Sequence, residues 1–451
     1  MNTQLSEHDL LDLKPFADKL EKFIRTEQEY VDGGLVVALS SKFGSGKTTF
    51  LEMWKANLEN QEDVIDTPFV ILLNAWESDY YGDPLFAIIS SLVHCLEESG
   101  EKADAIIDAA KDLGWFSLAI GNQVVQKVTG IDAVAAGELA EEKKAKRESA
   151  VQLPSDTFSA YQDRKDAMRH LKEAIQRFVD TTKPVVLFLV DELDRCRPDY
   201  AISYLETIKH IFDIHGAVFI LAADRQQLQN SARMAFGPKL DFEEYYRKFV
   251  HREVALPQIS DTCYRKLANA YVPRYLRKEG VRRCMSKIDG NYEDFTTSLI
   301  GALKLTPRQI QEVFRILGHT FDASQEDEGK LRWLLTISSV AMASFKVGNP
   351  QVFQLLGTQQ YDSDEAFNYL KELLHDEAPD WWFTLFLTGG GIKIDPDESE
   401  EDILTKYGII QKDSDLSNRN YIGQFHSGWG HATSSRFVQI HDMIEHISQW
   451  R

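Results

Sequence analysis

The chain has 451 residues, of which 43% are hydrophobic and 11% aromatic. Because a single hydrophobic core stops growing near about 250 to 300 residues, this length predicts two domains. The formal charge of -20 disfavours binding to duplex nucleic acid or anionic lipid, unless positive charge is gathered in one place.

Some positive charge is gathered in residues 225–287, where fourteen Lys or Arg stand against six Asp or Glu. Basic residues there alternate with Tyr264, Tyr271 and Tyr275, a mixture that can follow a nucleic-acid backbone and stack bases. The same mixture fits a solvated helix face, or a surface that meets an acidic part of another subunit. The overall acidity favours these two readings, and nucleic acid stays an alternative.

The cysteines and the first residues indicate the cellular compartment. The four cysteines show neither a C-x-x-C pair nor a zinc-like spacing, and MNTQLSEHDL is acidic without an apolar signal core. We therefore expect a cytoplasmic protein with free thiols.

In chain order, the first elements alternate between helices and strands. Residues 10–27 predict a helix, and the apolar, β-branched residues 34–41 predict a strand buried on both faces of a parallel sheet. A glycine-rich loop leads into a helix that starts near Lys47. Further strands are expected at 68–76, 184–192 and 216–224, and a helix at 83–98. This alternation predicts a three-layer α/β domain spanning residues 1–257.

The segment from about residue 101 to 160 interrupts the alternation of strands and helices. It is first Ala-rich and then charged and low in complexity, and we interpret it as an inserted helical region. Its most apolar part, 115–137, contains too many polar residues for an integral membrane segment. After Pro257 the pattern becomes helical and predicts a helical second domain over 258–376. Residues 377–451 are interpreted as an irregular region with a final helix and no assigned role.

The loop SSKFGSGKTTF (40–50) carries most of a phosphate-binding pattern, although Ser41 stands where the first glycine is expected. Glycines let the backbone curl until its N–H groups surround the phosphates. Lys47 would reach the β- and γ-phosphates, and the Thr48 hydroxyl would coordinate magnesium. The predicted nucleotide-binding residues of the loop are Phe43, Gly44, Ser45, Gly46, Lys47, Thr48 and Thr49. Ser41 is small enough to fit if its φ is negative.

The second half of the site is expected in VVLFLVDELDR (185–195), a buried strand that ends in two carboxylates. Asp191 would hold magnesium through water, and Glu192 would orient and deprotonate the attacking water. The alternatives without function are that the loop is a chance glycine-rich turn, and that the two carboxylates are solvated groups at the end of a strand. Both motifs follow predicted parallel strands, which favours a nucleotide site.

Four runs together resemble the KAP family of P-loop NTPases over about residues 15–320. They are SSKFGSGKTTFL, LLNAWESDYYGDPLFAIISSL, FLVDELDRCRPDYAISYLETIKHIF and FILAADRQQL. The resemblance implies an additional-strand ATPase core closed by residues 245–257, followed by a helical domain. It also implies that Arg308, in TPRQIQEVF, lies near the γ-phosphate, and that Asp224 senses the nucleotide state.

The sequence departs from the family pattern at three places besides Ser41. Phe43 replaces a usual tryptophan, and Glu192 replaces a frequent second aspartate, which favours hydrolysis. The insertion at 101–160 occupies the place where many members carry transmembrane helices. Arg195 and Arg225 are each candidates for an arginine finger that stabilises the negative charge of the reaction, in cis or across a subunit contact. Alternatively, Arg195 pairs with Asp194, and we favour this pairing.

The resemblance implies an ATPase that binds ATP and Mg²⁺ and acts as a nucleotide-driven switch or assembly factor. It would act on protein partners, and the chain could also form a homo-oligomer. Family members include phage-exclusion proteins and ATPase subunits of defence systems, which makes anti-phage defence the leading role. The alternatives are a nucleotide-gated scaffold with little turnover, and an ATPase stimulated by nucleic acid through residues 225–287.

Overall fold

The computed structural model describes residues 9–41, 44–60, 67–99, 104–112, 157–181, 185–279, 281, 290–323, 333–375, 377–411, 415–429 and 435–448. Phe43 and residues 113–156 of the expected insertion lie outside these ranges. The chain forms two compact units, Met1–Gln258 and Ile259–Arg451. The first unit ends within one residue of the expected boundary at 257.

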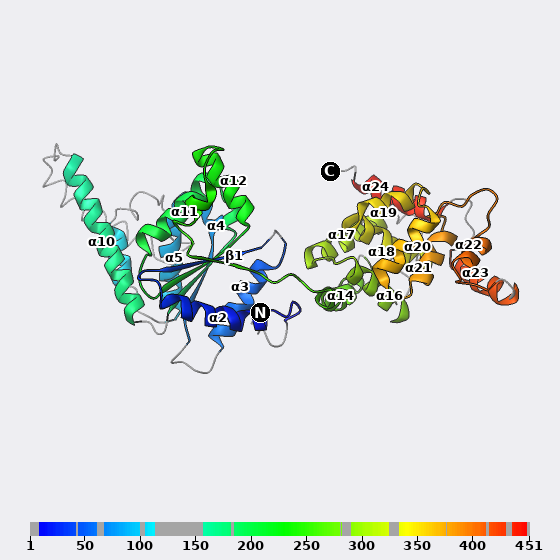
Figure 1. The fold of residues 1–451 in the computed structure, drawn as a ribbon, viewed down its shortest axis with the longest axis horizontal. Coiled ribbons are helices and arrows are strands. Elements are labelled where there is room, and N and C mark those ends of the chain that lie inside the picture. The colour runs from blue at the N-terminus through cyan, green and yellow to red at the C-terminus, as the bar shows by residue number, and fades with distance from the viewer. Residues whose placement is uncertain are drawn as a thin grey trace. The chain divides into compact units, whose positions relative to one another are not determined.

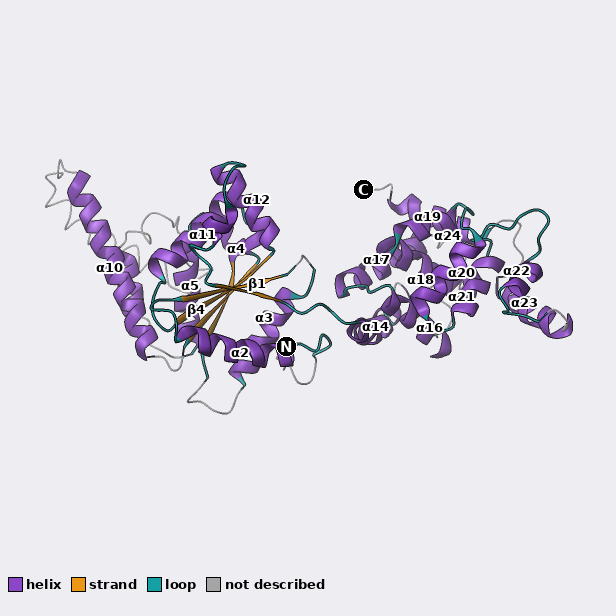
Figure 2. Cartoon of the chain, viewed as in Figure 1, coloured by secondary structure: helices purple, strands orange, loops and turns teal. Residues whose placement is uncertain are grey.

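A five-stranded parallel sheet in the order β2-β3-β4-β1-β5 forms the centre of the first unit (Figures 1 and 2). The strands are β1 (Leu35–Ser40), β2 (Phe69–Asn74), β3 (Val186–Asp191), β4 (Ala217–Ala223) and β5 (Arg252–Ala255). Strand β4 separates β1 from β3, which is the additional-strand arrangement that the family resemblance implied.

Two helical layers cover the sheet, and successive strand residues point into them alternately. Leu35, Val37 and Leu39 of β1 pack into the core beneath the first layer, whereas Val36 and Ala38 pack beneath the second. The first layer is made by α2 (Lys14–Gln28) and α3 (Lys47–Glu59). The second is made by α5 (Pro84–Glu98), α6 (Asp104–Asp112), α10 (Thr157–Thr181), α11 (Pro198–Ile211), α12 (Arg225–Phe236) and α13 (Phe242–Tyr246). The fold is therefore the predicted three-layer α/β fold.

The register of the sheet brings the C-terminal ends of β1, β2, β3 and β4 to the same level. Asn74 at the end of β2 is level with Asp191 at the end of β3. Asp191 is level with Ala222 of β4, and Ser40 of β1 is level with Ala223. Residues that directly follow these positions therefore gather at the carboxyl edge, where open α/β sheets bind ligands.

His251 extends the pairing between β1 and the exposed edge strand β5. Its backbone N–H donates to the Val36 carbonyl at 2.9 Å, and its Nδ1 accepts the Val36 N–H at 3.0 Å. Burial of the ring lowers the pKa of His251, as do the charges of Lys209 and Arg252, while Asp213 acts in the opposite direction. The folded chain therefore favours the neutral imidazole that this contact requires.

We expect the stability of the first unit to fall as the pH drops below about 6.5, because the unfolded chain then takes up a proton that folded His251 resists. His251→Asn keeps an acceptor near the Nδ1 position and should remove this part of the pH dependence. The effect is less than about 1 kcal/mol, since His251 is partly exposed. Urea unfolding at pH 7.5 and 5.5 measures it, with the exposed His210→Asn as control. Equal pH dependence in wild type and His251→Asn contradicts the prediction.

The second unit is helical. Its helices are α14 (Asp261–Leu276), α16 (Gly290–Ala302), α17 (Pro307–Ala323), α18 (Trp333–Gly348), α19 (Pro350–Gly357), α20 (Ser363–Leu374), α21 (Pro379–Thr388), α22 (Glu400–Lys406), α23 (Asp415–Trp429) and α24 (Arg436–Ser448). One core joins them, and α18 is buried over most of its length. Among the described helices, none combines the length and the apolar character that crossing a membrane requires.

The expectation of an irregular region after residue 376 is wrong for most of its described part. Four helices, α21 to α24, occupy this region, and Trp382, Phe386 and Phe437 lie in the same core as α18. The sequence pattern failed here because the aromatic run 381–386 lacks polar residues at helical spacing, and Gly389, Gly390 and Gly391 directly follow it. Tertiary packing makes these residues helical.

Candidate functional site

The phosphate loop follows β1 and leads directly into α3. Gly44 and Gly46 have φ angles of 81° and 91°, which side chains rarely adopt, and α3 begins at Lys47 as expected. Ser41 is not among the described non-glycine residues with positive φ. A serine is therefore tolerated in place of the first glycine.

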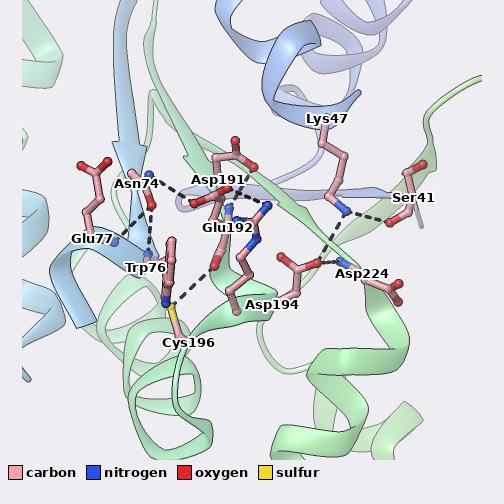
Figure 3. Close-up of polar contacts among 11 residues, drawn as sticks. Ser41, Lys47, Asn74, Trp76, Glu77, Asp191, Glu192, Asp194, Cys196 and Asp224 are labelled. Atoms are coloured by element: carbon pink, nitrogen blue, oxygen red, sulfur yellow. Dashed lines mark hydrogen bonds and ion pairs between the residues drawn. The ribbon is translucent and has the colours of Figure 1, made fainter. Parts of the chain in front are cut away.

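Lys47 points back across the loop toward the sheet (Figure 3). Its ammonium donates to the Ser41 carbonyl at 2.9 Å and forms an ion pair with Asp194 Oδ2 at 3.5 Å. The two side chains are only 9% and 5% exposed. In such surroundings the attraction between opposite charges is far less screened than in water.

The two residues expected to hold magnesium are in contact. A hydrogen bond joins the Thr48 side chain to the Asp191 carboxylate, and Asp191 is buried at the end of β3. Burial raises the pKa of Asp191, while the bonds from Thr48 and from the Glu192 backbone act in the opposite direction. Hydroxyl and carboxylate oxygens are ligands that Mg²⁺ favours, so this pair fits a magnesium ion.

Glu192 is held in an unusual conformation. Its φ of 60° lies in the left-handed region, which is costly for a non-glycine residue and frequent at functional sites. Its Oε2 accepts from Asn74 Nδ2 at 3.4 Å, and its Oε1 pairs with Arg195 at 2.9 Å. One oxygen therefore has a partner at the end of the neighbouring strand β2, and the other has a partner three residues further along the chain.

Asn74 and Trp76 connect Glu192 to the short helix α4 (Ala75–Asp79). Asn74 Oδ1 caps α4 by accepting from the backbone of Trp76 and Glu77 at 3.1 and 3.3 Å. The exposed Trp76 ring lies 5.6 Å from the Arg195 guanidinium carbon. The Asn-x-Trp segment thus positions both side chains that contact Glu192.

The favoured pairing of Arg195 with Asp194 gives way to another arrangement. The structure pairs Arg195 with Glu192, and Asp194 with Lys47. Both residues lie in the 3-10 turn η1 (Leu193–Arg195), where successive side chains point about 120° apart. The turn therefore directs the Asp194 carboxylate toward Lys47 of the phosphate loop, and the Arg195 guanidinium toward Glu192.

Asp224 lies directly after β4 and caps α12 by accepting from Gln226 N–H at 2.9 Å. Its own backbone N–H donates to Asp194 Oδ2 at 2.9 Å, so it lies beside the Lys47 ion pair. Arg308 lies on α17 in the second unit, and its role beside the γ-phosphate stays a prediction. Thr49 is exposed in the first turn of α3.

Sequence reasoning left two contributors without a role. Asp194 entered only as a partner of Arg195, and Asn74 only as part of a resemblance. The signal that identifies them is position, since each is a polar residue within three positions of a buried strand's carboxyl end. Cys196, in contrast, is buried, and burial raises the pKa of its thiol to about 12.

The loop fits the phosphates of a nucleotide. Ser45 Oγ is buried without a hydrogen-bond partner among the described residues, and a buried hydroxyl normally has one. A Cβ added at Gly44 would meet nothing within 4 Å, so the space beside this glycine is open. The backbone N–H groups of 44–48, Ser45 Oγ and Lys47 would hold the phosphates at the N-terminus of α3.

The basic segment 225–287 is divided between the two units. Arg225 forms ion pairs with Glu243 and Glu253, and in the second unit Arg265 pairs with Glu377. Tyr271 and Tyr275 pack against the helical core. These contacts resemble structural pairing more than a surface prepared for bases, and the finger role of Arg225 stays a prediction.

A parallel sheet in which β4 separates β1 from β3, a glycine loop after β1 and paired carboxylates after β3 together define a P-loop NTPase. The KAP family P-loop domain matches residues 13–321. This match covers more than half of the chain, which therefore belongs to the KAP family.

Two further comparisons concern curated proteins and solved structures. No curated protein matches the sequence. The solved structure of the Aeropyrum pernix ORC2 protein, in ADPNP–ADP complexes, is similar with 11% identity and a TM-score of 0.35; the match covers 98% of this chain and 95% of that one. So low a TM-score carries no argument about the site.

Proposed function

We propose that the chain binds ATP with Mg²⁺ and hydrolyses it to ADP and phosphate. One observation carries the proposal: Lys47, the Thr48–Asp191 pair and Glu192 gather at the carboxyl ends of the parallel strands β1 and β3, which flank β4. These residues supply a cation for the phosphates, oxygen ligands for a metal and a carboxylate for the attacking water.

Each residue has a separate part in this chemistry. Lys47 stabilises negative charge that develops on the phosphates, and Thr48 with Asp191 would hold Mg²⁺, which neutralises the phosphate oxygens. Glu192 accepts a proton from water, while Asn74 and Arg195 fix the direction of its carboxylate.

The test is magnesium-dependent phosphate release by the full chain and by Lys47→Ala. We expect the variant to lose about 10²-fold or more in turnover, as when a group that stabilises transition-state charge is removed. Lys55→Ala is the matched control, because Lys55 lies on the same helix and pairs with Glu59 away from the loop. Equal turnover by wild type and Lys47→Ala contradicts the proposal.

We further propose that the nucleotide state is passed to a protein partner, in anti-phage defence. The proposal is supported by the family membership. It is also supported by the site, whose described residues include no second reactive centre beside the nucleotide-binding groups. Cells that produce the wild-type chain with its neighbouring genes should resist phage, and cells with Lys47→Ala should not. Equal plaque numbers on both contradict this setting.

A further inference from the structure

The Lys47 ammonium, the group that would bind phosphate, already has an anionic partner inside the chain. Asp194 Oδ2 lies 3.5 Å from Lys47 Nζ, and both side chains are more than nine-tenths buried. A buried ammonium without a partner is strongly destabilising. Asp194 therefore stabilises the loop as it stands in this structure.

The same carboxylate oxygen has a second partner. It accepts the backbone N–H of Asp224 at 2.9 Å, and Asp224 caps α12. Asp194 therefore cannot turn away from Lys47 without also losing a bond to the end of β4. In Figure 3, dashed lines join the Asp194 carboxylate to Lys47 and to Asp224. The carboxylate is fixed where a phosphate bound to Lys47 would approach it.

We propose that Asp194 is a positioning residue that competes with the nucleotide phosphates for Lys47, and so weakens nucleotide binding. This inference rests on the proposed function. A phosphate at Lys47 brings negative charge close to the buried Asp194 carboxylate, and like charges at a few ångströms repel strongly in poorly solvated surroundings. Asp194 thus favours release of the product and keeps the loop intact after release.

The experiment measures ADP binding by calorimetry, with Mg²⁺, for wild type and Asp194→Asn. Asparagine keeps the shape and an oxygen that can accept the Asp224 N–H, but it removes the charge. We expect Asp194→Asn to bind ADP at least about tenfold more tightly. It should also melt at a lower temperature than wild type without ADP, and gain more than wild type when ADP is added.

Asp199→Asn is the matched control. Asp199 is an exposed carboxylate in the first turn of α11, five residues further along the chain. Its loss removes the same charge but leaves Lys47 paired, so its ADP affinity should equal that of wild type. A general effect of net charge would instead strengthen binding in both variants, and this result overturns the inference.

The remaining outcomes separate this inference from the proposed function. Equal or weaker ADP binding by Asp194→Asn, with wild-type binding intact, overturns the role of Asp194 alone, because a purely structural residue would act in that direction. Binding by Asp194→Asn but not by wild type supports the competition in its strongest form. Absence of binding by both overturns the proposed function together with the inference.

Discussion

Replacing Glu192 by glutamine should lower ATP turnover by about 10²- to 10⁴-fold, the usual contribution of a general base. Glutamine keeps the size and one acceptor oxygen, so it can hold the contact with Arg195 or the one with Asn74 but not both, and it cannot accept a proton from water. Nucleotide affinity should stay close to that of wild type, because in the proposed function the phosphates would be held by the loop and by Lys47 rather than by Glu192. Phosphate release measures turnover, and calorimetry with ADP measures binding.

Glu206→Gln provides the control, since Glu206 is an exposed glutamate on α11. It should hydrolyse ATP like wild type. Turnover of Glu192→Gln within about threefold of wild type would remove Glu192 from the chemistry. A parallel loss of ADP binding would show that the substitution damages the loop, and would argue against the separation of binding from hydrolysis.

The fold of the first unit could be predicted because its strands are short apolar runs buried on both faces. The four runs at 34–41, 68–76, 184–192 and 216–224 correspond to β1 to β4. Periodicity and composition say nothing about the order of strands, however. The place of β4 between β1 and β3 was implied only by the resemblance, and β5, with its exposed residues, lacks the pattern of a buried strand.

The site was predictable where side chains follow directly from backbone geometry. Gly44, Gly46 and Lys47 were expected in a tight loop between a strand and a helix, and the structure gives them this setting. Contacts between residues far apart in the sequence were not predictable. The pairing of Lys47 with Asp194 joins residues from two motifs, and it depends on the direction that a single 3-10 turn gives to each side chain.

The stability of the second unit should depend on the packing of its last described helix, α24, against the helical core. Gly357→Ala should destabilise this unit by about 2 to 4 kcal/mol. A Cβ at Gly357 would lie 2.2 Å from ring atoms of His441 on α24, far inside contact distance. The His441 ring also packs at a tilt against the Phe353 ring and hydrogen-bonds to Gln354 at 3.2 Å, so it cannot move without losing both contacts.

Gly318→Ala is the matched control, with the opposite sign expected. Gly318 lies inside α17, and a Cβ there would meet nothing within 4 Å. Alanine should therefore stabilise the helix by about 0.5 to 1 kcal/mol. Calorimetric unfolding of the full chain compares both variants with wild type. If Gly357→Ala unfolds at the wild-type temperature, α24 does not pack on α19, and Arg436–Ser448 is then available for a role outside the core. If it unfolds earlier while Gly318→Ala unfolds later, α24 is part of the structure that holds the second unit together.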